Sequence, residues 1–260
     1  MNQQQLLHWC RTYNTRSLED KWQKPLIMGI LNVTPDSFSD GGRYLSIRAA
    51  LDKALQMIAE GADILDIGGE SSKPGAVPVS VDEELSRVIP VIEHIRQDSD
   101  VAISIDTCKP KVMDAAIKAG ASMVNDITAL NDSAARKLIA ASGIPVCLMH
   151  MQGTPQTMQE NPAYATSVAD EIHSFFESKI NQCALSGIAK EQIILDPGFG
   201  FGKTATHNLL LLQHIKTFKR HNRPLLLGVS KKSTIGAILR KPIEQRSIGS
   251  LSASLFAARE

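Results

Sequence analysis

The chain has 260 residues, and its 28 Lys and Arg residues nearly balance its 27 Asp and Glu residues. This balance leaves no strong long-range field to attract nucleic acid or an anionic membrane surface, so neither is expected as a partner. Hydrophobic residues make up 43% of the chain but occur in short runs, and no stretch approaches the roughly 20 apolar residues that cross a bilayer.

The N-terminal segment and the cysteines both indicate a cytoplasmic protein. Residues 1–24 are expected to form a polar extension, since they carry Glu19 and Asp20 and lack the apolar segment and cleavage site of a secretory signal. The cysteines show no CxxC or Cys/His ligand spacing, which predicts reduced and buried thiols. They are Cys10, Cys108, Cys147 and Cys183.

From residue 25 onward, short apolar runs alternate with longer amphipathic segments, which is typical of a parallel sheet covered by helices. The seven runs predicted as strands are 26–31, 64–67, 101–105, 122–124, 145–149, 193–195 and 225–229. The segments predicted as helices between them are 44–58, 80–92, 111–119, 133–141, 165–185 and 208–218. No linker divides the chain, so residues 25–260 are expected to form one α/β domain.

Polar residues follow the end of nearly every predicted strand. Two long loops that contain glycine, 32–42 and 66–75, follow the first two strands. The later strand ends carry Asp106 and Thr107, Asn125 and Asp126, His150 and Gln152, Asp196, and the segment 230–232. In a (β/α) barrel all of these positions converge on one mouth, whereas a doubly wound sheet spreads them along an edge. The pattern therefore favours a barrel.

Each of these polar residues also has a purely structural interpretation. An Asp or Asn at a strand end can cap the next helix, and that alternative is open for Asp106, Asn125 or Asp196 taken singly. Several such ends together are better explained by a functional site. The segment 196–203 resembles a phosphate loop only superficially, because the glycine and lysine spacing differs and Pro197 removes a backbone donor.

Two lysines stand at the start of a predicted helix. Lys231 and Lys232 precede Ser233, and cations are unfavourable at the positive end of a helix dipole unless an anion is bound there. The pair therefore indicates an anionic ligand, with a solvated pair as the alternative. Met149 and Phe201 are interpreted as core residues or, alternatively, as walls of an apolar slot for a flat ring.

Taken in order along the chain, these motifs resemble the dihydropteroate synthase family. The matching segments are 29–42, 66–76, 104–107, 125–127, 149–153, 196–203 and 228–233. The resemblance covers roughly residues 25–260 and implies a TIM (β/α)8 barrel that binds a pterin. So many ordered motifs are far more specific than any single fingerprint.

The resemblance implies a transferase reaction of folate biosynthesis. In it, the amine of p-aminobenzoate displaces diphosphate from 6-hydroxymethyl-7,8-dihydropterin diphosphate and gives 7,8-dihydropteroate. Cleavage is expected to be dissociative, with the electron-rich pterin carrying the positive charge, so no strong base is needed. The resemblance also implies Mg²⁺ as cofactor, a homodimer, and sulfonamides as competitors of p-aminobenzoate.

The resemblance implies pterin-binding roles for residues at four strand ends and for one lysine. These residues are Asp106, Asn125, Met149, Asp196 and Lys232. A carboxylate can accept two hydrogen bonds from the guanidine-like edge of a pterin, which suits Asp196 as the main anchor. Asn32 is implied as the ligand of the Mg²⁺ that the diphosphate carries, since Mg²⁺ accepts few protein ligands beside phosphate oxygens and waters.

The p-aminobenzoate side of the site is implied to come largely from the two long loops. Its residues are Thr34, Pro35, Phe38, Ser72, Pro74, Phe201 and Ser233. Catalytic roles are implied for Asp36, Lys73 and Lys232. Asp36 would close over the site and stabilise the cation or accept the proton of the amine, and Lys73 lies on the loop that would exclude water.

Two departures from the family pattern are visible. The family usually carries Thr-Arg-Pro where this chain has Ser72, Lys73 and Pro74, so a point charge replaces a planar donor. The chain stops at Glu260, and the family's eighth strand and Arg-x-His diphosphate clamp have no counterpart before it. We therefore expect a barrel without its eighth strand, through truncation or as a short protein, and weak diphosphate binding if the short form is real.

Two rival functions remain open at this stage. One is a pterin-dependent methyltransferase domain, which shares the pterin-binding barrel but does not need the loops 32–42 and 70–75. The other is a catalytically impaired, synthase-like protein that only binds pterin, which the missing clamp makes plausible.

Overall fold

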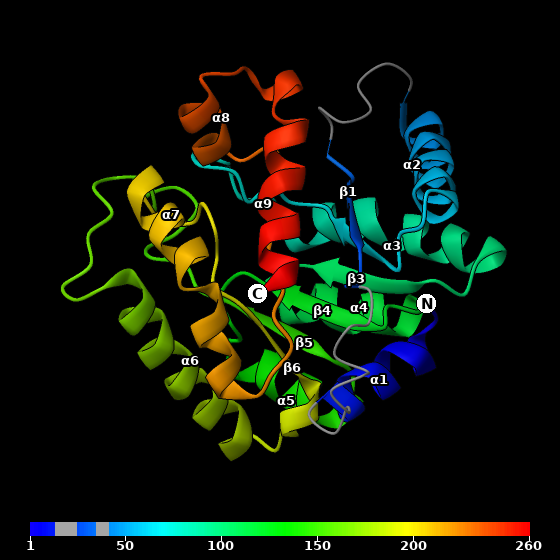
Figure 1. Cartoon of the computed structure of the whole chain (residues 1–260). Coiled ribbons are helices and arrows are strands. Elements are labelled where there is room, and N and C mark those ends of the chain that lie inside the picture. Colours follow the sequence, from blue (N-terminus) through cyan, green and yellow to red (C-terminus); the bar gives the residue numbers. More distant parts are fainter. Residues whose placement is uncertain (14–24, 35–41) are drawn as a thin grey trace.

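The computed structural model describes residues 1–13, 25–34 and 42–260. Within these ranges a six-stranded parallel sheet has its strands in chain order (Figure 1). The strands are β1 (Met28–Asn32), β2 (Ile64–Gly68), β3 (Ala102–Asp106), β4 (Met123–Asp126), β5 (Val146–Met149) and β6 (Ile193–Asp196). A sequential order has no point at which the winding reverses, so it confirms the barrel class over the doubly wound sheet.

Helices connect the strands and cover the outer face of the sheet (Figure 1). They are α1 (Gln3–Thr12), α2 (Gly42–Ala59), α3 (Val81–Asp98), α4 (Pro110–Ala119), α5 (Ser133–Ser142), α6 (Val168–Leu185), α7 (Ala205–Gln213), α8 (Ser233–Leu239) and α9 (Ser247–Arg259). Short 3₁₀ helices occur at η4 (Lys190–Gln192), η5 (Ile215–His221) and η6 (Ile243–Gln245). In the described part of the chain, no helix combines the length and hydropathy needed to cross a membrane.

The predicted helices are present, but the helix predicted at 80–92 runs on to Asp98, and two others differ locally. The helix predicted at 165–185 begins at Val168, because the side chain of Ser167 accepts a hydrogen bond from Asp170 N and caps it. The helix predicted at 208–218 divides into α7 and η5. There Thr217 directs both its backbone N–H and its hydroxyl to the carbonyl oxygen of His214, a local arrangement that competes with the regular helical pattern.

The seventh predicted strand, 225–229, is wrong as a strand and reduces to a single parallel bridge between Leu225 and Leu195. Leu195 N donates to Pro224 O at 2.9 Å, and Leu226 N donates to Leu195 O at 2.9 Å. Among the described residues this run has a strand on one side only. The ladder therefore ends after two hydrogen bonds, and the sheet remains open between this run and β1.

The two faces of the sheet have different chemistry, because successive side chains along a strand point to opposite sides. The outward side chains form the main core with the helices, and they include Leu65, Ile67, Ile103, Ile105, Val124, Val146, Leu148, Ile193 and Leu195. The inward side chains at the amino ends of the strands are apolar and pack with Leu6 and Cys10 of α1. Helix α1 therefore closes the amino end of the sheet.

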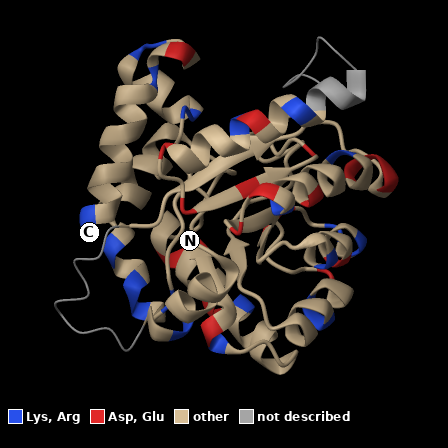
Figure 2. Ribbon diagram, turned by 90° about the vertical axis from the view of Figure 1, so that its right-hand side faces the viewer, with Lys and Arg blue, Asp and Glu red and all other residues tan. Residues whose placement is uncertain are grey.

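The inner face becomes polar toward the carboxyl ends of the strands. Asp66, Ser104, Asp106, Asn125 and Asp196 are the inward residues there. Figure 2 shows acidic residues on the strands as well as on the outer helices, where charges of both signs are interspersed. Charged groups inside a sheet are costly unless they serve a purpose, so this end of the sheet is the candidate site.

The cysteines are all free thiols, as predicted. Cys10, Cys147 and Cys183 are buried, and Cys108 is half-buried beside the carboxyl end of β3. Burial raises the pKa of Cys108 to about 11, so this thiol is protonated at neutral pH.

Candidate active site

The strand register places the predicted pterin residues side by side at the carboxyl end of the sheet. Asn32 pairs with Gly68, Gly68 with Asp106, and Asp106 with Asn125. Strands β1 to β4 each run one or two residues further than expected, so Asn32, Asp106 and Asn125 belong to the strands themselves. Their positions are therefore fixed by the ladder hydrogen bonds.

Gly68 provides the space between two of these side chains. A Cβ atom on Gly68 would lie 3.5 Å from Asp106 Oδ2 and 3.7 Å from Asn32 Oδ1. Both oxygens therefore face the space above the glycine. Any side chain at this position would occupy the space in which a ligand could meet Asn32 and Asp106 together.

Asn125 is oriented by a carboxylate that the sequence analysis did not include among the site residues. Asn125 Nδ2 donates to Asp66 Oδ2 at 3.0 Å, and Asp66 is 6% exposed. Burial raises the pKa of Asp66 to about 6. Asp66 lies two positions before Gly68, on the same face of β2, so the two-residue period of a strand was the signal that could have identified it.

Asp106 lies among other acidic groups. Burial, followed by the charges of Asp66, Asp126 and Glu84, holds the pKa of Asp106 well above its usual range, and Lys232 opposes this effect. Its side chain does not cap the next helix, because α4 begins after Lys109 without a side-chain cap. The structural alternative is therefore excluded for Asp106.

Asp196 ends β6 and pairs in register with Met149, which is 3% exposed. Its Oδ1 accepts a hydrogen bond from Gly198 N at 2.7 Å. Burial raises the pKa of Asp196 to about 6, and the Gly198 N–H and the charges of Lys232 and Lys203 counteract that rise. Helix α7 is capped by Thr204, so Asp196 is free of that role.

Asp126, in contrast, has a purely structural role in a turn. Its Oδ1 accepts from the backbone N–H and the hydroxyl of Thr128, each at 2.7 Å, and its Oδ2 accepts from Leu130 N at 2.9 Å. This carboxylate is fully used by its own turn. The sequence placed Asp126 beside Asn125 at a strand end, but only Asn125 faces the site.

Lys232 lies close to both the acidic groups and the aromatic ring of Phe201. Its Nζ lies 3.9 Å from the centroid of the Phe201 ring. Burial lowers the pKa of Lys232 to about 8, and the charges of Asp196 and Asp106 oppose that decrease. The structure thus brings together Asp106, Asp196, Lys232 and Phe201, as the sequence predicted.

A second buried lysine, Lys203, was not predicted as a site residue. It is 3% exposed, and its Nζ donates to His150 Nδ1 at 2.9 Å and to Phe201 O at 3.0 Å. Burial lowers the pKa of Lys203 to about 7 and that of His150 to about 3, so the imidazole is neutral and accepts the hydrogen bond. Lys203 joins the chain after β5 to the chain after β6.

The same two segments approach each other so closely that one of them needs glycines. Gly198 has a φ of +69°, and a Cβ atom on it would lie 1.8 Å from His150 O. A Cβ atom on Gly202 would lie 2.8 Å from Gln152 N. The glycines of the segment 196–203 therefore serve backbone packing, and not a phosphate loop.

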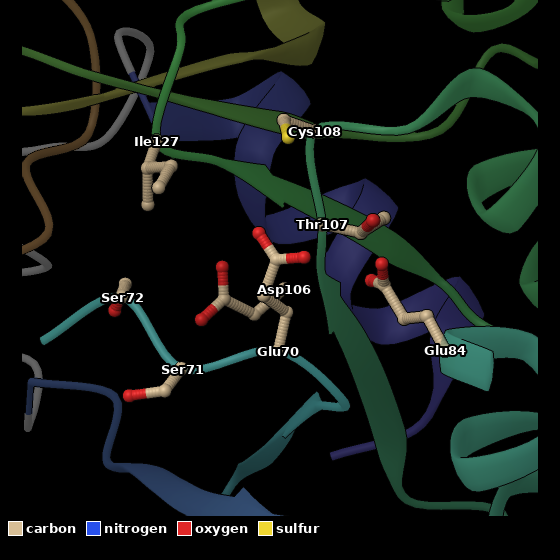
Figure 3. A pocket seen from close by; sticks show the side chains of 8 residues that line it. All are labelled: Glu70, Ser71, Ser72, Glu84, Asp106, Thr107, Cys108 and Ile127. Carbon is tan, nitrogen blue, oxygen red and sulfur yellow. The ribbon is translucent and has the colours of Figure 1, made fainter. Parts of the chain in front are cut away.

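The loop after β2 forms the opposite side of the site. Ser71 and Ser72 are half-buried and line a small hollow beside Asp106, whereas Lys73 and Pro74 are exposed at the turn (Figure 3). The remaining residues around the hollow are Glu70, Glu84, Thr107, Cys108 and Ile127. Of the predicted loop residues Ser72, Lys73 and Pro74, Ser72 is thus the one that lines this hollow with Asp106.

Ionic contacts hold the base of this loop. Lys109 Nζ donates to Glu70 Oε2 at 2.6 Å and also pairs with Glu84, which is 0% exposed. Glu70 Oε2 further accepts from Val79 N at 2.9 Å, so the two ends of the loop 70–79 are joined. No local sequence pattern predicts this triad, since its three members come from different elements.

The remaining predicted site residues lie at the rim. Thr34 is half-buried after β1, Asn32 is exposed, and Ser233 is the exposed first residue of α8. Pro35, Asp36 and Phe38 lie outside the described residues. Within the ranges that the structure describes, no cluster of three or more His, Cys, Asp or Glu residues is arranged to hold a metal ion.

Comparison with known proteins gives one consistent result. A family model described as "Pterin binding enzyme" matches residues 28–260. Dihydropteroate synthase of Escherichia coli (strain K12) is 51% identical over 236 residues, which is 91% of this chain and 83% of that protein. The enzyme of Haemophilus influenzae is 48% identical over 91% of this chain and 86% of its own length.

Solved structures show the same similarity. A Yersinia pestis dihydropteroate synthase in complex with a sulfonamide drug has a TM-score of 0.85 and 48% identity, over 90% of this chain and 85% of that one. A Xanthomonas albilineans dihydropteroate synthase in complex with 7,8-dihydropteroate has a TM-score of 0.82 and 44% identity, over 91% of this chain and 85% of that one.

Proposed function

The chain belongs to the dihydropteroate synthases within the family of pterin-binding enzymes, and on that premise we propose its reaction. It condenses 6-hydroxymethyl-7,8-dihydropterin diphosphate with p-aminobenzoate and releases 7,8-dihydropteroate and diphosphate. The observation that carries the proposal is the convergence of Asp106, Asn125, Asp196 and Lys232 at the polar carboxyl end of the sheet. These four side chains match the donors and acceptors of a pterin.

The pterin is recognised by acceptors on one side and a donor on the other. Ionised Asp196 accepts two hydrogen bonds from the guanidine-like edge, and Lys232 donates to the ring acceptors. Asn125 is held by one N–H that it donates to Asp66, so its amide oxygen and its second N–H remain available to the ligand. In this buried setting each such hydrogen bond is stronger than it would be in water.

The bond between the pterin methylene carbon and the diphosphate oxygen breaks first, and its electron pair leaves with the diphosphate. The electron-rich dihydropterin delocalises the resulting charge, and the p-aminobenzoate nitrogen then forms the new carbon–nitrogen bond and loses a proton. Asp106 faces the reacting region, and Asp36 is proposed to stabilise the cation or accept the proton. Mg²⁺ fits as an ion carried by the diphosphate and held by Asn32 Oδ1, where it would neutralise the leaving group.

The p-aminobenzoate is proposed to lie between the loop after β2 and Phe201. Ser72 lines the hollow beside Asp106, and the ring of Phe201 is fixed against Lys232 Nζ. Lys73 and Pro74 are exposed, and their proposed contribution is to orient p-aminobenzoate and to exclude water from it. Thr34, Pro35, Phe38 and Ser233 are proposed to complete this side.

The oligomeric state and the cellular location are two further proposals. We propose a homodimer, which the family resemblance and the exposed apolar side chains of Ile248, Leu251, Leu255 and Phe256 on α9 support. The proposed location is the cytoplasm. Sedimentation of the purified protein over a range of concentrations tests the dimer.

A diphosphate-release assay with both substrates and Mg²⁺ tests the reaction. We expect release that requires p-aminobenzoate, product with the mass of dihydropteroate, and inhibition by a sulfonamide that added p-aminobenzoate relieves. Calorimetric binding of pterin diphosphate without release that depends on p-aminobenzoate would overturn the proposal in favour of a protein that only binds pterin. Transfer of a folate methyl group would instead identify a methyltransferase.

A further inference from the structure

The connection between β5 and α6 has a built structure of its own. Gln152 Nε2 donates to Ala163 O at 2.6 Å, and Ala163 N donates to Gln152 Oε1 at 3.2 Å, so the two ends of the segment 152–163 are joined. Met158 within it is 3% exposed. A compact loop with joined ends and a buried side chain holds its shape and can position its neighbours. We refer to residues 152–164 as the β5 loop.

One side of the β5 loop contacts the loop after β2. Gly75 N donates to Pro155 O at 3.1 Å, and Gln156 Nε2 donates to Ala76 O at 3.0 Å across 80 residues of sequence. These contacts hold the tip of the loop 70–79, whose base is held separately by Glu70. The tip contacts lie directly after Pro74.

The other side of the β5 loop contacts the chain after β6. Gln159 Nε2 donates to Gly200 O at 2.8 Å, and Tyr164 Oη donates to Gly202 O at 2.9 Å. Gly200 lies against the stem of Lys232, since a Cβ atom on it would be 3.1 Å from Lys232 Cδ. In Figure 1 the β5 loop is the green coil that leaves the sheet near α6 and α7.

We propose that the β5 loop sets the distance between the two halves of the substrate site, with Gln156 and Gln159 as positioning residues. This inference rests on the proposed synthase function. Gln156 fixes the turn that carries Ser72 and Pro74, and Gln159 fixes the segment that carries Phe201 beside Lys232. Preorganised loops bind more tightly because less conformational entropy is lost on binding.

The two glutamines are suited to a test because both are exposed and each donates one hydrogen bond from its side-chain amide to a backbone carbonyl. Replacing either glutamine leaves a backbone carbonyl that water can reach, so the fold should be retained. The segment that the glutamine holds is then no longer fixed in place. The variants are Gln156→Met and Gln159→Met, which keep side-chain length and remove the donor. Gln182→Met, on the outward helix α6, is the matched control.

Steady-state kinetics by diphosphate release should separate the two contacts. Gln156→Met is expected to raise KM for p-aminobenzoate about three- to tenfold with little change in kcat or in KM for the pterin diphosphate. Gln159→Met should raise both KM values, and the control neither. If Gln156→Met leaves KM for p-aminobenzoate within about twofold of wild type, or raises both KM values equally, the proposal is overturned.

Hydrogen exchange gives a readout that does not depend on activity. In Gln156→Met, peptides that cover residues 70–79 should exchange faster than in wild type, and peptides of β2 should not. Unchanged exchange at 70–79 overturns the inference even if the wild type is active. Absence of diphosphate release from the wild type, with faster exchange in the variant, would instead reject the proposed function and support the positioning role of the β5 loop.

Discussion

The two halves of the substrate site are built from different parts of the fold. The proposed pterin half consists of Asp106, Asn125, Met149 and Asp196, at the carboxyl ends of β3, β4, β5 and β6, together with Lys232. The p-aminobenzoate half consists of loop residues such as Ser72, Lys73 and Pro74, of which the last two are exposed. Ladder hydrogen bonds fix the first set, whereas a few side-chain contacts fix the second.

The half built from strand residues is therefore rigid, whereas the half built from loop residues is adjustable. The buried carboxylates proposed to bind the pterin lie on strands and cannot shift independently, so changes there should affect the first substrate strongly. The loop residues can move with little effect on the core, so changes there should affect mainly the second substrate. Substitutions in each half therefore test this separation.

Asp196→Asn should weaken pterin diphosphate binding by about 100-fold. The change places an amide N–H against the donor edge of the pterin, and two hydrogen bonds to a charged group at roughly 1.5 kcal/mol each are lost. Calorimetry on the variant and on Asp114→Asn, a half-buried position on α4 paired with Lys118, measures the effect. An unchanged Kd would remove Asp196 from the rigid half.

Lys109→Met should destabilise the protein by about 2 kcal/mol, because it leaves the carboxylate of fully buried Glu84 unpaired. The value is below that of a fully buried pair, since Lys109 and Glu70 keep partial contact with water. Urea denaturation measures it, with the exposed Lys118→Met as control. Adding Glu84→Gln to Lys109→Met should recover part of the loss, and a wild-type midpoint for Lys109→Met would show that the base of the loop 70–79 is not anchored this way.

The rate should depend on pH through the pterin half. Pterin recognition needs Asp196 ionised and Lys232 protonated, and the pKa values of these groups are about 6 and about 8. The kcat/KM for pterin diphosphate should therefore peak near neutral pH and fall about tenfold one pH unit below about 6 or above about 8. Lys232→Arg, which stays charged, should shift the alkaline limb upward. A flat profile from pH 5 to 9 contradicts these assignments.

The same difference explains what could be predicted from sequence. Asp106, Asn125 and Asp196 were identifiable because short apolar runs fix the strands and the carboxyl ends of parallel strands converge. The strand-end pattern does not identify Asp66, because this residue lies inside the predicted strand 64–67 and β2 continues through Gly68. The run 225–229 was predicted from composition alone, which does not reveal that it has a strand on one side only.

The contacts of the loops could not be predicted in this way. Lys203 gains its role from His150, and Gln156 from Ala76, which lie far away in sequence and share no period with them. A hydrogen bond from an exposed amide to a carbonyl has no signature in composition or spacing. Sequence patterns therefore predicted that the strand-end residues converge, whereas the proposed roles of the loop residues rest on the family resemblance.

The smallest expected effect tests the adjustable half directly. Lys73→Arg restores the residue type that the family usually carries, and a planar guanidinium can bind the carboxylate of p-aminobenzoate through two hydrogen bonds. Because Lys73 is exposed, the gain should be only about 0.5 kcal/mol, or about a twofold lower KM for p-aminobenzoate, and it should vanish at high salt. Kinetics at two ionic strengths, with Lys118→Arg as control, measure it. A decrease of tenfold or more would mean that residue 73 is held as firmly as the strand residues, and the contrast between the two halves would then fail at this position.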